Sequence, residues 1–564
     1  MTAKRWFLML AAAALLVAAA VAGLNILADP FGVFGDRLLG WYAYDMTQNP
    51  KAAKVAYIDA HSGEYDAFIL GASGSASFSP EKLNEYTGLR WYNAFNYGAD
   101  MAYTEKLAEY LAGSCEVRQF FLALSLTAAQ KYEMPQNGAI EWRPPQLGGA
   151  GGWFRFAFAN PRFSFAKLRD YRANGYLQEP FDVFVPETGV YDKSSRDVEP
   201  IGSLDAYLAA YPEFTTKIGV VAELTRTDEC MASVARLKAM CDARGIGLTV
   251  VVPPLLDRSL SAYRAEDLAD FFAKLGEITP YYDYTRFIPS DPRFYYDTTH
   301  FRNCAGDMIL ADIYGDDGVY VPSGETEETE LRVLLYHSVT ESGGEDSVSA
   351  ADFRRDMERL RDGGYTPVGL SDIAGYVYRG AELPERAVLI RLDDGYRDNY
   401  EVAYPILREF GYKAVIFAIG VSVGRDVYKD TDAPITPHFT AEEAREMTGS
   451  GLIEIQSHTY DMHMVAELDG ADCRRGLLRL DGESEADYAA ALTGDFLRSR
   501  SELEAATGQP VYALAYPYGL HDKLSEVVLG KLGVTATFSS EYGVNTLVRG
   551  LPQSLLCLKL WAFG

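Results

Sequence analysis

Acidic and histidine side chains with the spacing of a metal site lie in the C-terminal part of the sequence. Asp393 and Asp394 are adjacent and precede Gly395, and His458 and His463 lie five residues apart. Two histidines and one carboxylate form a ligand set that leaves positions open for water and substrate, as a catalytic zinc or similar divalent ion requires. The second carboxylate then remains for work as a base. These residues predict a catalytic divalent-metal site.

The predicted elements bring these side chains to one edge of a sheet. Polar clusters follow short apolar runs at residues 387–392, 452–456 and 511–515. Such strand-like runs alternate with helix-length amphipathic stretches near residues 350–363 and 400–410. This alternation predicts βαβ units and a parallel sheet or barrel. In such folds the chemistry sits at the C-terminal ends of the strands, where the three clusters fall.

The segment from about residue 331 to the C-terminus resembles a known family. It is similar to the polysaccharide deacetylases of carbohydrate esterase family 4, which share the NodB homology domain. Leu-Asp-Asp-Gly at 392–395 resembles the first motif of that family, Ser457–His463 the second and Tyr516–Gly519 the third. Tyr336-His337 is similar to its common opening. The five-residue histidine separation resembles the branch that includes poly-N-acetylglucosamine deacetylases.

The resemblance implies a distorted (β/α) barrel that hydrolyses N-acetyl groups from a hexosamine glycan. It implies Asp393 as the catalytic base that takes a proton from water. Asp394, His458 and His463 become the ligands of a divalent metal ion, zinc or another transition metal. The backbone N–H near Tyr518 becomes a donor to the oxyanion. An O-acetyl esterase of the xylan type differs only in the acyl linkage and stays open as an alternative.

Two features of that family are missing from this sequence. The arginine usual before the Pro-Tyr of the third motif is absent, and residues 560–564 end the chain without the family's Leu-x-x-His, which supplies the general acid. His521, just after the third motif, is the candidate acid that remains. His337 fits packing and site lining equally well, and His438 fits a plain loop.

A second α/β domain is predicted before this segment, over residues 29–321. Residues 65–70, 119–126 and 247–252 have the apolar character of buried strands, and residues 229–244 have the pattern of a helix. This arrangement predicts an α/β/α sandwich.

A serine and an Asp–His pair form a candidate site in this domain. A Gly- and Ser-rich turn at residues 71–77 follows the first strand, and Asp297 and His300 stand three apart at a predicted helix start, where they share a face. Such residues can form a nucleophilic triad. The pattern resembles the SGNH hydrolase superfamily, with Ser73 as nucleophile, Asp297 and His300 as the late pair and Gly98 as an oxyanion donor.

The SGNH resemblance comes with two departures. Ala72 replaces the usual Asp before the nucleophile, and Leu124–Leu126 replaces the block that carries an asparagine. The nearest resemblance is to membrane-tethered acyltransferases and esterases of envelope glycan assembly. It implies an O-acyl esterase or acyltransferase site with a membrane-embedded acyl-transfer partner. A fold retained for glycan binding is the alternative.

The N-terminus predicts a membrane-anchored protein. Residues 6–28 form an apolar stretch of about the 20 residues that span a bilayer, preceded by Lys4 and Arg5. A cleaved signal peptide ending near Ala28 is the alternative. In both cases the basic end stays in the cytoplasm, and everything after Asp29 lies on the extracytoplasmic face.

The organisation predicted is an anchor or uncleaved signal (1–28), an SGNH-like domain (29–321), a short acidic linker (322–330) and a deacetylase domain (331–564). Residues between 130 and 214 are rich in Tyr, Phe, Pro and Gly and predict either a lid that stacks on sugar rings or a packed insertion.

The overall charge limits the partners. A formal net charge of −27 disfavours nucleic acid or anionic lipid as a partner, because neither polyanion is attracted to so acidic a surface. An N-acetylated glycan substrate is compatible with it. The sequence leaves two classes of function: an envelope enzyme, or an envelope-tethered glycan-binding scaffold with degenerate sites.

Overall fold

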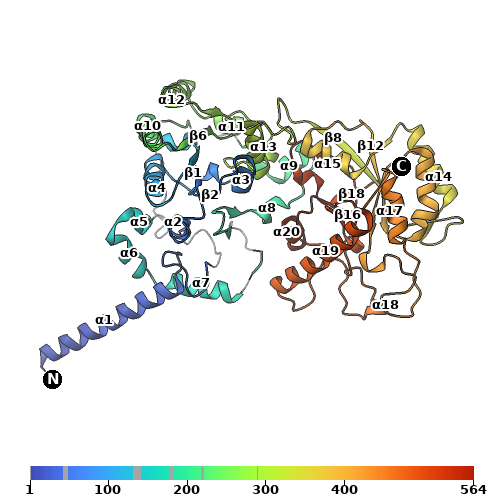
Figure 1. Ribbon diagram of the computed structural model, residues 1–564, viewed down its shortest axis with the longest axis horizontal. Coiled ribbons are helices and arrows are strands. Elements are labelled where there is room, and N and C mark those ends of the chain that lie inside the picture. Colours follow the sequence, from blue (N-terminus) through green and yellow to red (C-terminus); the bar gives the residue numbers. More distant parts are fainter. Residues whose placement is uncertain are drawn as a thin grey trace. The chain divides into compact units, whose positions relative to one another are not determined.

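The computed structural model describes residues 2–41, 49–130, 142–173, 175–177, 183–216, 221–288 and 290–563. The chain divides into two compact units, which Figure 1 colours along the sequence. The first unit comprises Met1–Lys193 and Pro212–Gly315, and the second comprises Ser194–Tyr211 and Asp316–Gly564.

The predicted apolar stretch at the N-terminus forms the long helix α1, Ala3–Ala28, of 26 residues. Its most apolar 18-residue window has a mean hydropathy of 2.6, and none of that window is buried inside the protein. At 1.5 Å per residue the helix is about 39 Å long, enough for a hydrocarbon core of about 30 Å. By length and composition, α1 can cross a membrane.

In its described part, the first unit is built on a five-stranded parallel sheet with the order β2-β1-β3-β6-β7. The central strand residues are buried on both faces, as expected of a parallel sheet covered by helices. The strands are β1 Ala67–Gly71, β2 Trp91–Asn93, β3 Gln119–Ala123, β6 Gly247–Val252 and β7 Tyr282–Asp283.

Helices pack on both faces of this sheet. One group, α4, α10 and α12, shares an apolar core with β1, β3 and β6, and in Figure 1 it lies on the opposite side of the sheet from α3 and α13. The helices are α2 Pro50–Ala60, α3 Pro80–Thr87, α4 Met101–Ser114, α10 Thr227–Arg244, α11 Asp257–Leu260, α12 Ala265–Ile278 and α13 Asn303–Tyr314. A smaller part contains α5 Pro145–Gly148, α6 Ala150–Ala157, α7 Arg162–Ala173, β4 Val183–Phe184 and β5 Tyr191–Asp192.

The second unit is a mixed α/β domain around a nearly closed, barrel-like sheet. In its described part the strand order is β17-β8-β12-β13-β14-β15-β16-β18, with β11 beside β12. The backbone N–H of Trp561, just after β18, donates to the Val333 carbonyl of β8 and brings the two ends of the sheet together. The strands are β8 Glu328–Tyr336, β11 Thr366–Pro367, β12 Ala387–Asp394, β13 Ala414–Ala418, β14 Ile453–Ser457, β15 Ala513–Ala515, β16 Ala536–Tyr542, β17 Asn545–Val548 and β18 Leu558–Leu560.

Helices alternate with these strands, as the sequence pattern predicts. They begin at clear caps: the Ser349 side chain accepts from Asp352 N at the start of α14, and Thr440 and Glu443 form a capping box on α17. The elements are α8 Ser194–Asp197, α9 Leu204–Ala210, β9 Ser338–Thr340, β10 Ser347–Ser349, α14 Ala350–Asp362, α15 Leu370–Arg379, α16 Tyr404–Phe410, α17 Ala441–Gly449, α18 Ala466–Asp469, α19 Glu485–Thr507 and α20 Lys523–Lys531.

The structure differs from the predicted organisation in two places. β8 begins at Glu328, inside the segment 322–330 predicted as linker, because Glu328–Leu331 pairs with β17. The segment Ser194–Tyr211 belongs to the second unit although it falls within the predicted first domain. Its backbone is held there by a hydrogen bond from Ile201 N to the Gln553 carbonyl, a contact between residues too distant in sequence for any local pattern to indicate.

Candidate active site

Three predicted ligands come together at the C-terminal ends of neighbouring strands. Asp394 ends β12, His458 follows β14, and His463 lies in the loop after it. The Nε2 atoms of His458 and His463 each lie 3.5 Å from Oδ1 of Asp394. One ligand atom from each residue falls within 4.8 Å of the others. The three side chains therefore converge as the spacing predicts.

The donor set fits a divalent metal ion. Within the described residues, Oδ1 of Asp394 is buried and receives no hydrogen bond, so an ion at this point would compensate it. Nδ1 of His458 donates to the Ala515 carbonyl at 2.8 Å, which leaves Nε2 unprotonated and facing Asp394. Burial lowers the pKa of His458 to about 4, so the imidazole is neutral, as a ligand must be.

The loop between the two histidines is held by a carboxylate of α19. Asp495 is half-buried and accepts from the backbone N–H groups of Tyr460 at 2.8 Å and Asp461 at 2.7 Å, one on each oxygen. Thr459, beside them, has a φ of 68°, in the left-handed region that a β-branched residue adopts only under constraint. Asp495 thus positions His463 relative to His458.

Asp495→Asn is expected to weaken metal binding by about 10- to 100-fold, the range for residues that orient ligands. The amide keeps one acceptor oxygen but presents N–H to the second backbone donor. Competition with a chromophoric chelator measures the affinity. Glu502→Gln, on the exposed side of the same helix, is the matched control. Unchanged affinity in Asp495→Asn would show that the loop needs no such support.

Asp393 is held by an arginine that the sequence analysis missed. Nε and Nη2 of Arg391 donate to the two carboxylate oxygens of Asp393 at 2.7 and 2.5 Å, and Nη1 donates to the Ser539 carbonyl. Both side chains are buried. Burial raises the pKa of Asp393, but the Arg391 guanidinium outweighs it and holds the pKa below its usual value. The signal in the sequence was an arginine inside an otherwise apolar strand.

The third motif forms a tight turn beside the metal ligands. Tyr518 has a φ of 59°, and its ring lies 4.3 Å from the ring of His463. Its hydroxyl donates to the Met464 carbonyl. The N–H groups of Gly519 and Leu520 donate to carbonyls within the turn, which leaves the Tyr518 N–H as the candidate donor to an oxyanion.

Three further histidines lie in the second unit with different surroundings. His521 stacks on Tyr516 at 3.9 Å, and its Nε2 lies 3.4 Å from Sγ of Cys557, so this candidate acid is engaged away from the ligands. His337 is exposed directly after β8, whose last paired residue, Tyr336, lies opposite Leu392, the residue before Asp393. Its charge is one of those that lower the pKa of Asp393.

His438 differs from the plain loop residue that the sequence suggested. It is buried, and its ring lies 5.0 Å from that of Tyr396. Burial lowers the pKa of His438 to about 4 although Asp394 acts in the opposite direction. The imidazole is therefore neutral and lies near the metal ligands. Its position is set by a β-bridge between Tyr396 and His438.

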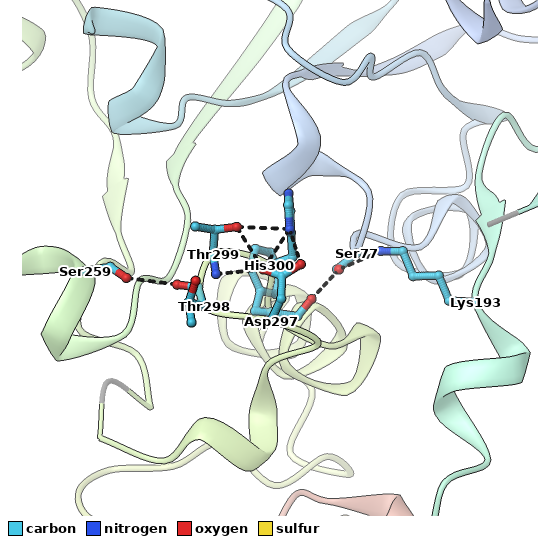
Figure 2. Close-up of polar contacts among 8 residues, drawn as sticks. Ser77, Lys193, Ser259, Asp297, Thr298, Thr299 and His300 are labelled. Atoms are coloured by element: carbon cyan, nitrogen blue, oxygen red, sulfur yellow. Dashed lines mark hydrogen bonds and ion pairs between the residues drawn. The ribbon is translucent and has the colours of Figure 1, made fainter. Parts of the chain in front are cut away.

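In the first unit, the predicted Asp–His pair is formed. Figure 2 shows Nδ1 of His300 bonded to Oδ2 of Asp297 at 2.7 Å and to Oγ1 of Thr299 at 3.1 Å. Burial raises the pKa of Asp297, but the hydrogen bonds from His300 and Thr299 outweigh it and hold the pKa well below its usual value. The pair lies in a turn before α13 and not at the helix start predicted for it, because α13 begins only at Asn303.

Ser73 follows β1 in a 3-10 turn, as predicted for the nucleophile. Among the described residues no hydrogen bond joins Ser73 to His300. The turn that carries Ser73 does contact the loop of His300, because Ser77 donates to the Phe301 carbonyl at 2.6 Å (Figure 2). Tyr97, next to the predicted oxyanion donor Gly98, places its ring 6.3 Å from that of His300.

The predicted lid lies partly outside the described residues, which omit 131–141, 174 and 178–182. Its described parts are the helices α5 to α9, the strands β4 and β5, and the turns between them. The aromatic side chains of α6 and α7 are divided between a buried cluster and the surface.

Comparison with known proteins supports the predicted similarity of the second unit to polysaccharide deacetylases. Residues 380–537 match the family model of polysaccharide deacetylases. YxkH of Bacillus subtilis, a protein named for that family, is 38% identical over 141 residues, 25% of this chain and 45% of that protein. A poly-beta-1,6-N-acetyl-D-glucosamine N-deacetylase of Escherichia coli is 27% identical over 230 residues, 37% of this chain and 34% of that protein.

A solved de-N-acetylase of Aggregatibacter actinomycetemcomitans is 26% identical, with a TM-score of 0.36, and the match covers 41% of this chain and 94% of that one. The chain spans less than half the length of the B. subtilis and E. coli relatives. The family-model match and the B. subtilis and E. coli relatives support the prediction of an enzyme that acts on carbon–nitrogen bonds.

Proposed function

We propose that the second unit removes N-acetyl groups from an extracytoplasmic hexosamine-containing polysaccharide, with a divalent metal ion, zinc or another transition metal. The observation that carries the proposal is the convergence of Asp394, His458 and His463 beside Asp393. It lies within the segment that matches polysaccharide deacetylases. The glycan class is supported by the names of the relatives from E. coli and Staphylococcus aureus, which are poly-beta-1,6-N-acetyl-D-glucosamine N-deacetylases.

The residues of the site take separate roles in this hydrolysis. When bound, the ion supplies Lewis acidity to the amide carbonyl and lowers the pKa of water. Asp393 accepts the proton of the attacking water, and Arg391 keeps that carboxylate ionised and fixed in direction. The Tyr518 N–H donates to the oxyanion as the carbonyl carbon becomes tetrahedral.

We assign the proton donor to His337 in place of His521, the candidate that the sequence offered. The departing nitrogen needs a proton, and His337 is exposed at the end of the strand that neighbours β12, close enough for its charge to act on Asp393. His521 is engaged by Tyr516 and Cys557, and His438 is held neutral by burial and so has no proton to give at neutral pH.

His337→Gln is expected to lower kcat for amide hydrolysis by about 10²-fold or more. Hydrolysis of 4-nitrophenyl acetate should fall far less, because nitrophenolate leaves without a proton. His521→Gln is the control and should change neither rate selectively. Equal losses on the amide and the ester in His337→Gln would remove His337 from the role of acid.

The substrate class is tested by acetate release from two materials by the full chain. Oligomers of β-1,6-linked N-acetylglucosamine should release acetate, and acetylated xylan should not. Release from xylan alone would favour the O-acetyl esterase instead. Binding of the N-acetylated oligomer without release from either material would favour a glycan-binding scaffold.

The proposed location is the extracytoplasmic face of a membrane, with α1 as its anchor. The helix has the length and apolar composition for a span, and Lys4 and Arg5 lie at its N-terminal end. Positive residues favour the cytoplasmic side, so the two units would follow on the other side.

The Asp297–His300 hydrogen bond favours a second candidate function in the first unit. An SGNH-type O-acyl esterase or acyltransferase would use His300 to take the proton of Ser73, with Asp297 orienting the imidazole. A transferase would need an acyl donor, which a membrane-embedded partner would supply. Ser73→Ala should stop O-acyl turnover and leave N-acetyl hydrolysis unchanged. O-acyl turnover that survives Ser73→Ala would exclude this site.

A further inference from the structure

An exposed aromatic face lies beside the C-terminal end of α1. Trp153 and Phe154 on α6 and Phe158 just after it are exposed, and on α7 Phe165 and Tyr171 are exposed. The exposed fractions of Phe154 and Phe165 are 67% and 62%, high for such large apolar side chains. We call these five residues the aromatic face. It is a concentration of apolar surface that needs an explanation.

The opposite side of these helices is fixed in the first unit. Phe156 of α6 is fully buried against Phe31, with ring centroids 5.2 Å apart. Phe163 of α7 packs on the same ring at 5.3 Å. The two helices are therefore amphipathic: one side of each packs inside the first unit, and the other side lies at the surface.

The end of α1 is joined to the same two helices. The buried side chain of Asn25 donates to the Ala157 carbonyl at the end of α6 and to the Ala159 carbonyl just after it, and it accepts from Ser164 of α7 at 2.7 Å. In Figure 1, α7 lies directly beside this end of α1, at the lower left. The position of the aromatic face along the anchor is consequently fixed.

An ion pair strengthens this junction. Nζ of Lys167 in α7 lies 2.7 Å from Oδ2 of Asp36, with both side chains fully buried, and it donates to the Asp29 carbonyl. The Asp29 carboxylate in turn accepts from three backbone N–H groups of residues 33–36. Removal of α1 near Ala28 would leave the buried partners of Asn25 unsatisfied, which favours an anchor that is retained.

Charge near the aromatic face is the reverse of the charge of the whole chain. Residues 150–173 carry four arginines against one acidic residue, Asp170, in a protein of net charge −27, and the charge of their one lysine, Lys167, is compensated by Asp36. Aromatic rings and basic groups together are characteristic of helices that lie in the interfacial region of a bilayer. The arginines attract lipid phosphates, while the rings enter the boundary of the acyl chains.

We propose that the aromatic face lies in the lipid headgroup region of the membrane that α1 crosses. The occupant of this surface is the bilayer, because the face continues directly from a helix with the length and composition of a span. The proposal rests on the proposed anchor and is independent of the deacetylase chemistry. Its consequence is that the first unit sits against the membrane instead of moving freely on its anchor.

Quenching of Trp153 fluorescence by brominated phospholipids tests the proposal with the full chain in liposomes. The difference between the native protein and Trp153→Phe isolates this residue. We expect at least twofold quenching, stronger for bromine near the headgroup than near the bilayer centre. The matched control, Trp91→Phe, removes a buried tryptophan of the first unit and should reveal an unquenched component.

A double variant, Phe154→Ser/Phe165→Ser, should reduce the quenching of Trp153 at least twofold without a change in Tm, because both side chains are exposed. An unquenched Trp153 in protein that resists alkaline carbonate extraction would overturn the proposal and indicate that a protein partner or a second copy covers the face. Extraction of the chain by carbonate would overturn the anchor and the proposal together, whereas acetate release would be unaffected.

Discussion

Asp393→Asn is expected to lower kcat for acetate release from an N-acetylglucosamine oligomer by about 10³-fold, within the usual range for the loss of a general base. Asparagine has nearly the same shape but cannot accept the proton of the attacking water. The metal ligands Asp394, His458 and His463 are unchanged, so metal content should stay the same. Acetate assays and elemental analysis of the same preparation measure both quantities.

The arginine partner provides the control for this substitution. Asp393→Asn leaves the buried guanidinium of Arg391 without its carboxylate, which costs about 3–5 kcal/mol when a buried pair loses one member. The double variant Arg391→Met/Asp393→Asn removes that charge and should recover part of the lost Tm while activity stays low. Activity that recovers together with Tm would show that Asp393 serves stability and not proton transfer.

His458→Gln is expected to weaken metal binding by more than about 100-fold, beyond the effect of residues that only orient ligands. The imidazole Nε2 is lost, and the amide cannot replace it while it remains bonded to the Ala515 carbonyl. Acetate release should fall in proportion to the metal lost. Elemental analysis after dialysis, followed by assays across added zinc, measures the two effects.

The matched control for that experiment is His521→Gln. His521 is a half-buried histidine of the same unit, and its ring contacts Tyr516 and Cys557 and not the metal ligands. This variant should keep its metal. Full metal occupancy in His458→Gln would contradict the assignment of the three ligands.

Local sequence patterns predicted the parts of the site that depend on one strand end each. The run 387–392 became most of β12. Asp394 ends that strand and His458 follows β14, and the two meet because parallel strands place their C-terminal ends at one edge. The third motif, Tyr516–Gly519, likewise follows its strand, β15. Fold class followed from the alternation of strand and helix patterns.

Contacts between distant segments could not be read from such patterns. The roles of Asp495 and of His438 depend on which loop each side chain meets after folding. The pairing of Arg391 with Asp393 is local, but the family resemblance implies an arginine in the third motif and none in this strand. In the first unit, Asp297 and His300 met as their three-residue spacing indicated. The position of Ser73 relative to them depends instead on contacts between distant segments, such as the hydrogen bond from Ser77 to the Phe301 carbonyl.

The most direct test of the metal-dependent deacetylase is acetate release from N-acetylglucosamine oligomers by the full chain in detergent, first chelated and then reloaded with zinc. The predicted result is activity that disappears with the chelator, returns with the metal, is lost in Asp393→Asn and is unchanged in Ser73→Ala. Release that persists without metal, or that depends on Ser73 and not on Asp393, would contradict it.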